Sequence, residues 1–279
     1  MKKLNLNRII TRKTLFLMAI LLCAGGRAMC QRPPEEFFTG MDKLYINLPE
    51  AKQLLLIAAK KDSAFHGTYH FLGTIATRQH QPDSAIYYYK KSISLNTGNI
   101  NHTAEMTWVR LINEYVYQKD FKAAFDAGWE ACKKYPDNKQ LLTALKDACL
   151  WAFFIKYDKL DPAYLSADIR DEYVVNAIDQ EYLIVRKLRV DDNYLSVSGQ
   201  KLISKNNASY DVLVCAIGST DKTREVNFKI NWDMAKYFGG RPAATSDIDA
   251  TKPIYERIGA LLQGDSKIDV KAEIEKMLK

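Results

Sequence analysis

The sequence has few of the residues on which catalytic and metal sites usually depend. Its 279 residues include four histidines and five cysteines, and no cysteine pair has CxxC spacing. HExxH, GxSxG, GxGxxG and P-loop motifs are also absent. The sequence does not exclude a Ser-His-Asp triad, because the three residues of such a triad come together in space and need not be close in sequence. We therefore expect a protein without enzymatic activity, cofactor or resident metal.

Long apolar runs are scarce, and the most marked one lies at the N-terminus. A basic stretch, 1–13, contains no acidic residue, and the apolar run 15–24 follows it before a pair of small residues. This order predicts a secretory signal peptide over residues 1–30, with cleavage after Ala28 or after Cys30. The mature chain is then periplasmic or secreted.

The apolar run is too short for a permanent membrane helix, which needs about 20 residues. We therefore expect no transmembrane segment in the mature chain, with a retained anchor as the alternative. A bacterial lipoprotein is not favoured, because Leu22 and Met29 rather than small residues precede Cys23 and Cys30.

The positive charge of the chain is concentrated in the same segment. Six of the 40 lysines and arginines lie in residues 1–30, which leaves 34 against 33 acidic residues in the rest. The predicted mature chain is therefore close to neutral, and it lacks the strong basic patch that nucleic-acid binding requires.

Two residue pairs leave alternatives open. Cys132 and Cys149 are able to form a disulfide in an exported chain, but small buried hydrophobic residues are the preferred interpretation of both and of Cys215. His66 and His70 share a helix face and suggest a metal pair. They lack an evident third ligand, so two exposed polar residues are the preferred interpretation.

Internal repetition with a period of 34 residues is the strongest pattern in the chain. Ala51 and Ala85 are 34 residues apart, as are Leu55 and Tyr89. Ala124 follows Ala85 after one period plus five residues. Each repeated stretch has helical spacing and places a small residue where a neighbouring helix must approach closely.

These stretches resemble the tetratricopeptide repeat family, whose pattern is W-x2-L-G-x2-Y, then A-x3-F, then Pro. The matching residues are Leu72-Gly73, Ala85 and Tyr89 in the first full repeat and Trp108, Leu111, Tyr115, Ala124, Ala131 and Pro136 in the second. The chain departs from the pattern at Thr97, Ile112 and Gly128. Residues 35–47 give no convincing leading helix for a further, degenerate repeat.

The resemblance implies a stack of helix pairs with ligands along the inner face of the leading helices. The corresponding positions are His70, Thr74, Arg78, Val109, Asn113 and Tyr117. In the alternative interpretation, these six are ordinary surface residues, and the groove along the inner face of the leading helices is filled by the C-terminal domain of the same chain. A closing helix over 138–158 carries three bulky residues, Trp151, Phe153 and Phe154, and is expected to seal the stack.

The pattern changes after Pro162, where strand-like alternation replaces the repeat. We expect an α+β fold: a helical repeat domain over 31–162 and a small antiparallel-sheet domain over 165–279. The predicted strands are 172–178, 194–205, 209–218 and 225–232, with the last two forming a hairpin. Asp179 is a candidate cap for an ambiguous segment, 179–190, and the stretches 253–262 and 269–279 are predicted helices.

Residues 170–240 are similar to an uncharacterised domain family found in secreted proteins of Bacteroides-type bacteria. The similarity depends on Glu181-Tyr182, Gln200-Lys201-Leu202, Tyr210-Asp211-Val212-Leu213 and Phe228. It implies no particular activity.

The preferred hypothesis is an exported scaffold that binds a protein or peptide partner of the cell envelope. The alternatives are a hydrolase with its site in the C-terminal domain, and an accessory subunit of an outer-membrane complex.

Overall fold

The computed structural model describes residues 32–191 and 193–231, together with Ala272 and Glu275. The predicted signal peptide and Trp232 lie outside the described residues, as do nearly all of the two predicted C-terminal helices. The chain divides into two compact units at Ser63/Ala64. The described residues form a mixed α and β fold with eight α-helices and one five-stranded sheet.

The first unit contains two packed helices, α2 (Glu35–Lys43) and α3 (Leu48–Lys61). Asn47 caps α3 by accepting a hydrogen bond from the backbone N–H of Glu50 at 3.2 Å. Helix α2 corrects the expectation that residues 35–47 lack a convincing helix. Its acidic first turn and its basic last residue suit the helix dipole, and Phe37 is buried. The helical spacing of apolar residues was a weak signal in the sequence here, because α2 has only nine residues.

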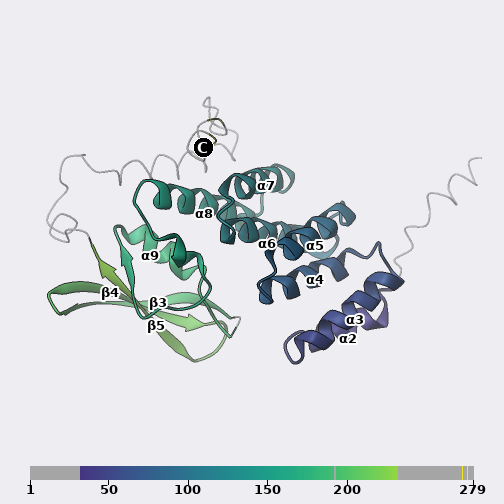
Figure 1. The fold of residues 1–279 in the computed structure, drawn as a ribbon, viewed down its shortest axis with the longest axis horizontal. Helices are drawn as coiled ribbons and strands as arrows, with labels where there is room; N and C mark the ends of the chain where they lie inside the picture. Colours follow the sequence, from purple (N-terminus) through teal and green to yellow (C-terminus); the bar gives the residue numbers. More distant parts are fainter. Residues whose placement is uncertain (1–31, 192, 232–271, 273–274, 276–279) are drawn as a thin grey trace, which may run out of the picture. The chain divides into compact units, whose positions relative to one another are not determined.

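The second unit begins with five helices that pack against their neighbours in the chain (Figure 1). They are α4 (His66–Arg78), α5 (Pro82–Leu95), α6 (Thr103–Tyr117), α7 (Phe121–Lys134) and α8 (Lys139–Lys156). A 3-10 turn, η1 (Ile100–His102), precedes α6. Helix α8 begins and ends within two residues of the predicted bounds, 138–158. Caps such as Asp120 and Asn138 define the starts of α7 and α8 locally.

Small residues allow close helix packing, as the sequence predicted. A Cβ atom on Gly73 of α4 would lie 2.5 Å from the ring of Tyr89 in α5. A Cβ atom on Gly128 of α7 would lie 2.9 Å from the side chain of Leu145 in α8. Gly128, where the repeat pattern usually has an aromatic residue, therefore makes room for the next helix.

The chain then forms a five-stranded sheet with the order β1-β5-β4-β3-β2. The strands are β1 (Tyr173–Val175), β2 (Arg189–Val190), β3 (Asn193–Lys205), β4 (Ala208–Ile217) and β5 (Thr223–Ile230). The β4–β5 hairpin is antiparallel and β4 is central, as predicted. β1 pairs with β5 in parallel, so the sheet is mixed rather than antiparallel. After β1 the chain crosses to the opposite edge of the sheet through a helix, and this crossover permits the parallel pairing.

The crossover helix is α9 (Ile178–Val185), which contacts β1, β3 and α8 and lies between the sheet and α8 (Figure 1). Its N-cap is Ala177, so Asp179 lies within the first turn rather than at the cap. A 3-10 turn, η2 (Pro162–Leu165), precedes β1 and is capped by Asp161.

One continuous hydrophobic core connects α4 to β5. Trp151, Phe153 and Phe154 are all buried in it, as expected for a sealing helix. The core crosses the domain boundary that we placed between residues 162 and 165, because α8 packs directly on α9. All three described cysteines are free and buried, so their interpretation as small core residues is confirmed.

Candidate functional site

The predicted binding residues lie on two helices of the second unit, α4 and α6. His70, Thr74 and Arg78 lie one turn apart on α4, and Val109, Asn113 and Tyr117 are spaced in the same way on α6. The two helices contact each other. The face made by these six residues is called the α4/α6 face below.

His70 lies inside the helix packing rather than at an accessible surface. Its side chain is 5% exposed, and its Nδ1 is 2.8 Å from the Oγ1 atom of Thr107 on α6. Burial lowers the pKa of His70 to about 4, with smaller contributions from the positive charges of Arg110 and His66. His70 is therefore neutral at pH 7 and joins α4 to α6. His66 is also buried, so the expectation of two exposed histidines was wrong.

Thr74 and Arg78 are half-buried on α4. The hydroxyl of Thr74 donates to the carbonyl of His70 at 3.1 Å, one turn earlier in the same helix. On α6, Val109 is half-buried and packs against the hydrophobic core.

Asn113 and Tyr117 contact a residue from the C-terminal part of the chain. The Nζ atom of Lys187, just after α9, donates a hydrogen bond to Oδ1 of Asn113 and lies 5.6 Å from the centroid of the Tyr117 ring. For these two residues the structure agrees with the alternative in which the chain fills its own groove.

Lys187 is held in this position by burial and by its neighbours. Its side chain is 4% exposed. Burial lowers the pKa of Lys187 to about 8, Asp147 opposes this shift, and Arg189 and Arg186 add to it. The preceding residue, Arg186, forms a bidentate ion pair with Asp147 of α8, at 2.8 and 3.0 Å. Two consecutive side chains therefore join the end of α9 to α6 and α8.

Sequence reasoning missed a polar group beside the α4/α6 face. Glu114 is 5% exposed and accepts a hydrogen bond from the hydroxyl of Thr77. Burial raises the pKa of Glu114, while Thr77 and the charge of Arg110 oppose the shift. The spacing of Arg110 and Glu114, four residues apart on a predicted helix, was the available signal.

Arg110 is the residue of this polar group whose side chain is available to bind a ligand. It is half-buried, and its charge acts on His70, Tyr89, Glu114 and Tyr117. Within residues 32–191 and 193–231, no hydrogen bond or ion pair of its side chain is found. A half-buried guanidinium without a direct partner is suited to bind a carboxylate.

A second polar group, Glu181 and Asp211, lies between α9 and β4. Both residues belong to the segment that resembles the uncharacterised domain family, and both are buried, at 0% and 4% exposure. Burial raises the pKa of Glu181 to about 9, and the negative charge of Asp211 adds to the shift. Gln200 donates a hydrogen bond to Asp211. Glu181 is therefore protonated at pH 7.

This acid pair is a structural element rather than an accessible catalytic pair. A general acid or base must reach a substrate, and neither carboxyl group is at the surface. The four histidines lie before residue 103 and not in this part of the chain.

The remaining chemical groups do not assemble into a metal or thiol site. No cluster of three or more potential metal ligands occurs among the described side chains. Burial raises the pKa of Cys132 and of Cys215 to about 11, and it also raises the pKa of Cys149. These thiols are therefore protonated at pH 7 and poor nucleophiles.

Comparison with known proteins gives no assignment. No protein-family model matches the chain, and no curated protein matches it. The contacts described above are therefore the basis for proposing a function.

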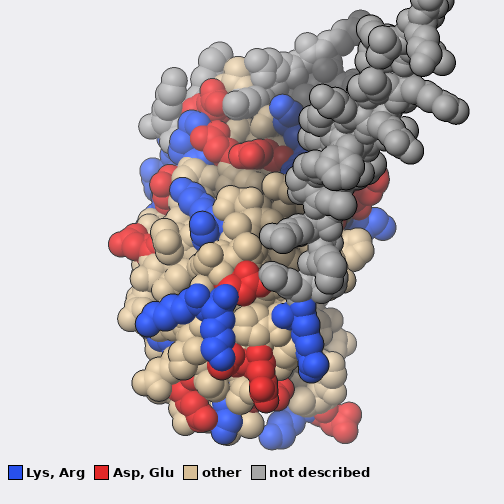
Figure 2. Space-filling model, turned by 90° about the vertical axis from the view of Figure 1, so that its right-hand side faces the viewer, with Lys and Arg blue, Asp and Glu red and all other residues tan. Residues whose placement is uncertain are grey.

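One face of the molecule has a mixed surface charge. On the face shown in Figure 2, positive and negative side chains are interspersed and form no continuous patch of one sign. None of the helices within the described residues combines the length and the apolar character needed to cross a bilayer.

Proposed function

We propose that this chain is an exported bacterial envelope protein that binds a protein or peptide partner through the α4/α6 face without catalysing a reaction. Its helices would form a tetratricopeptide-like repeat stack, and the C-terminal sheet would be part of the same scaffold. The order of basic, apolar and small residues before Gln31 supports export. The close approach at Gly73, a position that matches the repeat pattern, supports the repeat interpretation.

The observation that carries the proposal is that the α4/α6 face already holds a polypeptide side chain. Asn113 supplies a hydrogen-bond acceptor and Tyr117 an aromatic surface for Lys187. A face that binds a side chain of its own chain has the polar and aromatic groups that peptide recognition uses.

Arg110, beside the α4/α6 face, would bind the partner together with the α4 residues of that face. Arg110 has no direct partner within the described residues, and Thr74 and Arg78 are half-buried nearby on α4. A carboxylate from an acidic side chain of the partner would gain a charge-assisted hydrogen bond at Arg110. The proposed partner is therefore a protein segment with at least one acidic residue.

An affinity capture from envelope extract tests the proposal. The bait is residues 31–279, compared with an Arg110→Ala variant and with a control, Lys133→Ala. Lys133 is exposed on α7, away from the α4/α6 face, so its loss removes one positive charge elsewhere. Circular dichroism first establishes that all three proteins are folded.

We expect a partner that is captured by the parent and the control and reduced about tenfold with Arg110→Ala. Equal capture by all three proteins would contradict Arg110 and the adjoining α4/α6 face as the binding surface. The same loss in both variants would indicate a general charge effect and would also contradict it.

A further inference from the structure

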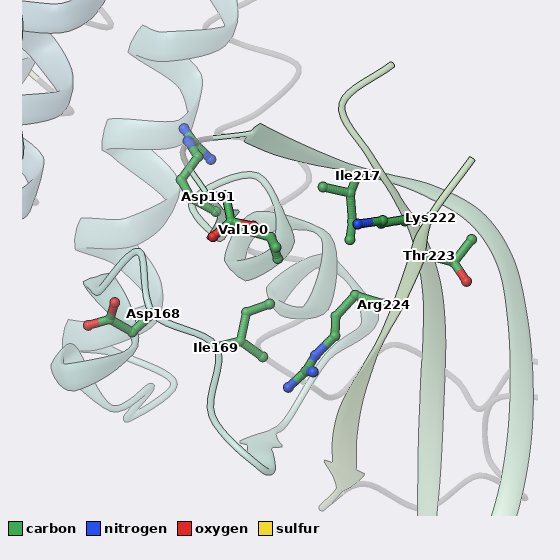
Figure 3. Close-up of a pocket in the computed structure, with 9 residues that line it drawn as sticks. Asp168, Ile169, Val190, Asp191, Ile217, Lys222, Thr223 and Arg224 are labelled. Carbon is green, nitrogen blue, oxygen red and sulfur yellow. The ribbon is translucent and has the colours of Figure 1, made fainter. Parts of the chain in front are cut away.

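The inner face of the sheet, which packs against α9, is not fully covered by that helix. Helix α9 has eight residues, which span about 12 Å, whereas the ten residues of β4 span about 33 Å. At the β4–β5 turn, the uncovered end of the face forms a hollow of about 650 Å³ (Figure 3). Its lining comes from the segment before β1, from β2 and from the ends of β4 and β5.

The base of this hollow is aliphatic. Ile217 is buried, and Ile169 and Val190 are half-buried and packed against the hydrophobic core. Figure 3 shows these three side chains directed into the space between the segment before β1 and the strands. An apolar group placed there would remove from water its own surface and the exposed parts of Ile169 and Val190.

The β5 side of the hollow carries two positive charges. Lys222 and Arg224 are exposed, and within the described part of the chain neither side chain has a hydrogen bond or an ion pair. In Figure 3 the Lys222 side chain extends toward Ile217, and Arg224 extends toward the region of Ile169. Both charges therefore lie at the border of the aliphatic base.

The acidic residues of the lining do not neutralise these two charges. The Asp168 carboxylate accepts a hydrogen bond from the hydroxyl of Ser166 at 3.0 Å, and Figure 3 shows it turned away from the strands. Asp191 is exposed on the β2 side. No ion pair joins either aspartate to Lys222 or Arg224.

We propose that this hollow binds a small amphipathic anion, namely a carboxylate with a short alkyl chain. The alkyl chain would lie on Ile169, Val190 and Ile217, and the carboxylate would bind Arg224 and Lys222. The hollow of about 650 Å³ is wide enough for a short alkyl chain, and it is open to solvent, so the carboxylate would stay at its rim beside Arg224 and Lys222. This site is separate from the α4/α6 face and does not depend on the function proposed above.

Isothermal titration calorimetry with octanoate tests the site on residues 31–279, which include every described residue. Octanol, which has the same chain length without the charge, separates the contribution of the carboxylate. The variants are Arg224→Gln and Lys222→Gln. Lys229→Gln is the matched control, because Lys229 lies on the same strand, β5, outside the lining of the hollow. Vesicles of phosphatidylglycerol test whether the anion is instead recognised as part of a membrane.

We expect the parent protein to bind one octanoate per chain. Octanol should bind the parent about tenfold more weakly, and Arg224→Gln should bind octanoate about tenfold more weakly. Lys229→Gln should bind octanoate as the parent does. Lys222→Gln should weaken binding by a smaller factor, because a lysine contact is less directional. The three variants should unfold at the same urea concentration as the parent, since all three positions are at least partly exposed.

Four results would overturn the proposal. These are an absence of octanoate binding, equal affinity for octanol and octanoate, equal weakening in Arg224→Gln and Lys229→Gln, and binding to vesicles without binding to free octanoate. The last result would indicate a membrane-docking surface rather than a site for a free anion.

Discussion

At the scale of single residues, Lys187 makes the stability of the second unit depend on pH. Burial lowers its pKa from 10.5 to about 8 in the folded chain. Between these values the unfolded chain binds the proton and the folded chain does not, so the contribution of Lys187 to stability rises with pH. A Lys187→Met variant lacks this term. From pH 7.5 to pH 10, the parent should therefore gain about 2 kcal/mol of unfolding free energy relative to the variant.

Urea unfolding of both proteins at several pH values measures this difference. Tyrosine and cysteine side chains titrate in both proteins, so their contributions cancel in the difference in unfolding free energy between the parent and Lys187→Met. Lys133→Met, at an exposed position on α7, is the control and should show no such pH dependence. A difference between parent and Lys187→Met that stays constant from pH 7.5 to pH 10 would show that Lys187 is solvated in the folded chain.

At the scale of elements, the approach of α4 to α5 depends on the absence of a side chain at Gly73. An added Cβ atom would lie 2.5 Å from the ring of Tyr89, which is fully buried and hydrogen-bonded to Thr77 at 3.1 Å. Overpacking costs about 1–3 kcal/mol, and the better helix propensity of alanine returns about 1 kcal/mol. Gly73→Ala should therefore lower the unfolding free energy by up to about 2 kcal/mol.

Gly98 offers the matched control for this change. It lies in the loop before α6, and no atom is found within 4 Å of a Cβ atom built there. Gly98→Ala should change stability by less than about 0.5 kcal/mol in the same urea titration. Equal stability of Gly73→Ala and the parent would mean that α5 shifts without cost, and the close packing at Gly73 would then not be required.

The elements also show how far the sequence could predict this fold. Helices α3 to α8 and the β4–β5 hairpin follow from apolar spacing, caps and turns, which are local signals. The parallel pairing of β1 with β5 depends on contacts between residues 55 positions apart, such as Tyr173 and Phe228, and has no local signal. The candidate site also depends on a distant contact. Asn113 was predicted as a binding residue, but its hydrogen-bond partner Lys187 lies 74 positions away and has no local signal in the sequence.

At the scale of the whole molecule, the second unit should unfold as one cooperative body. The hydrophobic core is continuous from α4 to β5, and the ion pair of Arg186 with Asp147 joins α9 to α8. A shared core makes separate unfolding of helices and sheet costly, because each would expose apolar surface that the other covers. Two domains with separate cores on either side of the predicted boundary at residues 162–165 would instead unfold separately.

The buried cysteines report on the two regions individually. Cys149 lies in α8 and Cys215 in β4, and each is at most 1% exposed. A pulse of thiol-labelling reagent at increasing urea concentration, followed by mass spectrometry of the peptides, measures when each thiol becomes reactive. We expect both labelling midpoints to coincide with each other and with the loss of helical circular dichroism. Labelling of Cys215 at a clearly lower urea concentration than Cys149 would mean that the sheet opens while the helices stay folded, and that the α8–α9 contact is a weak interface between domains.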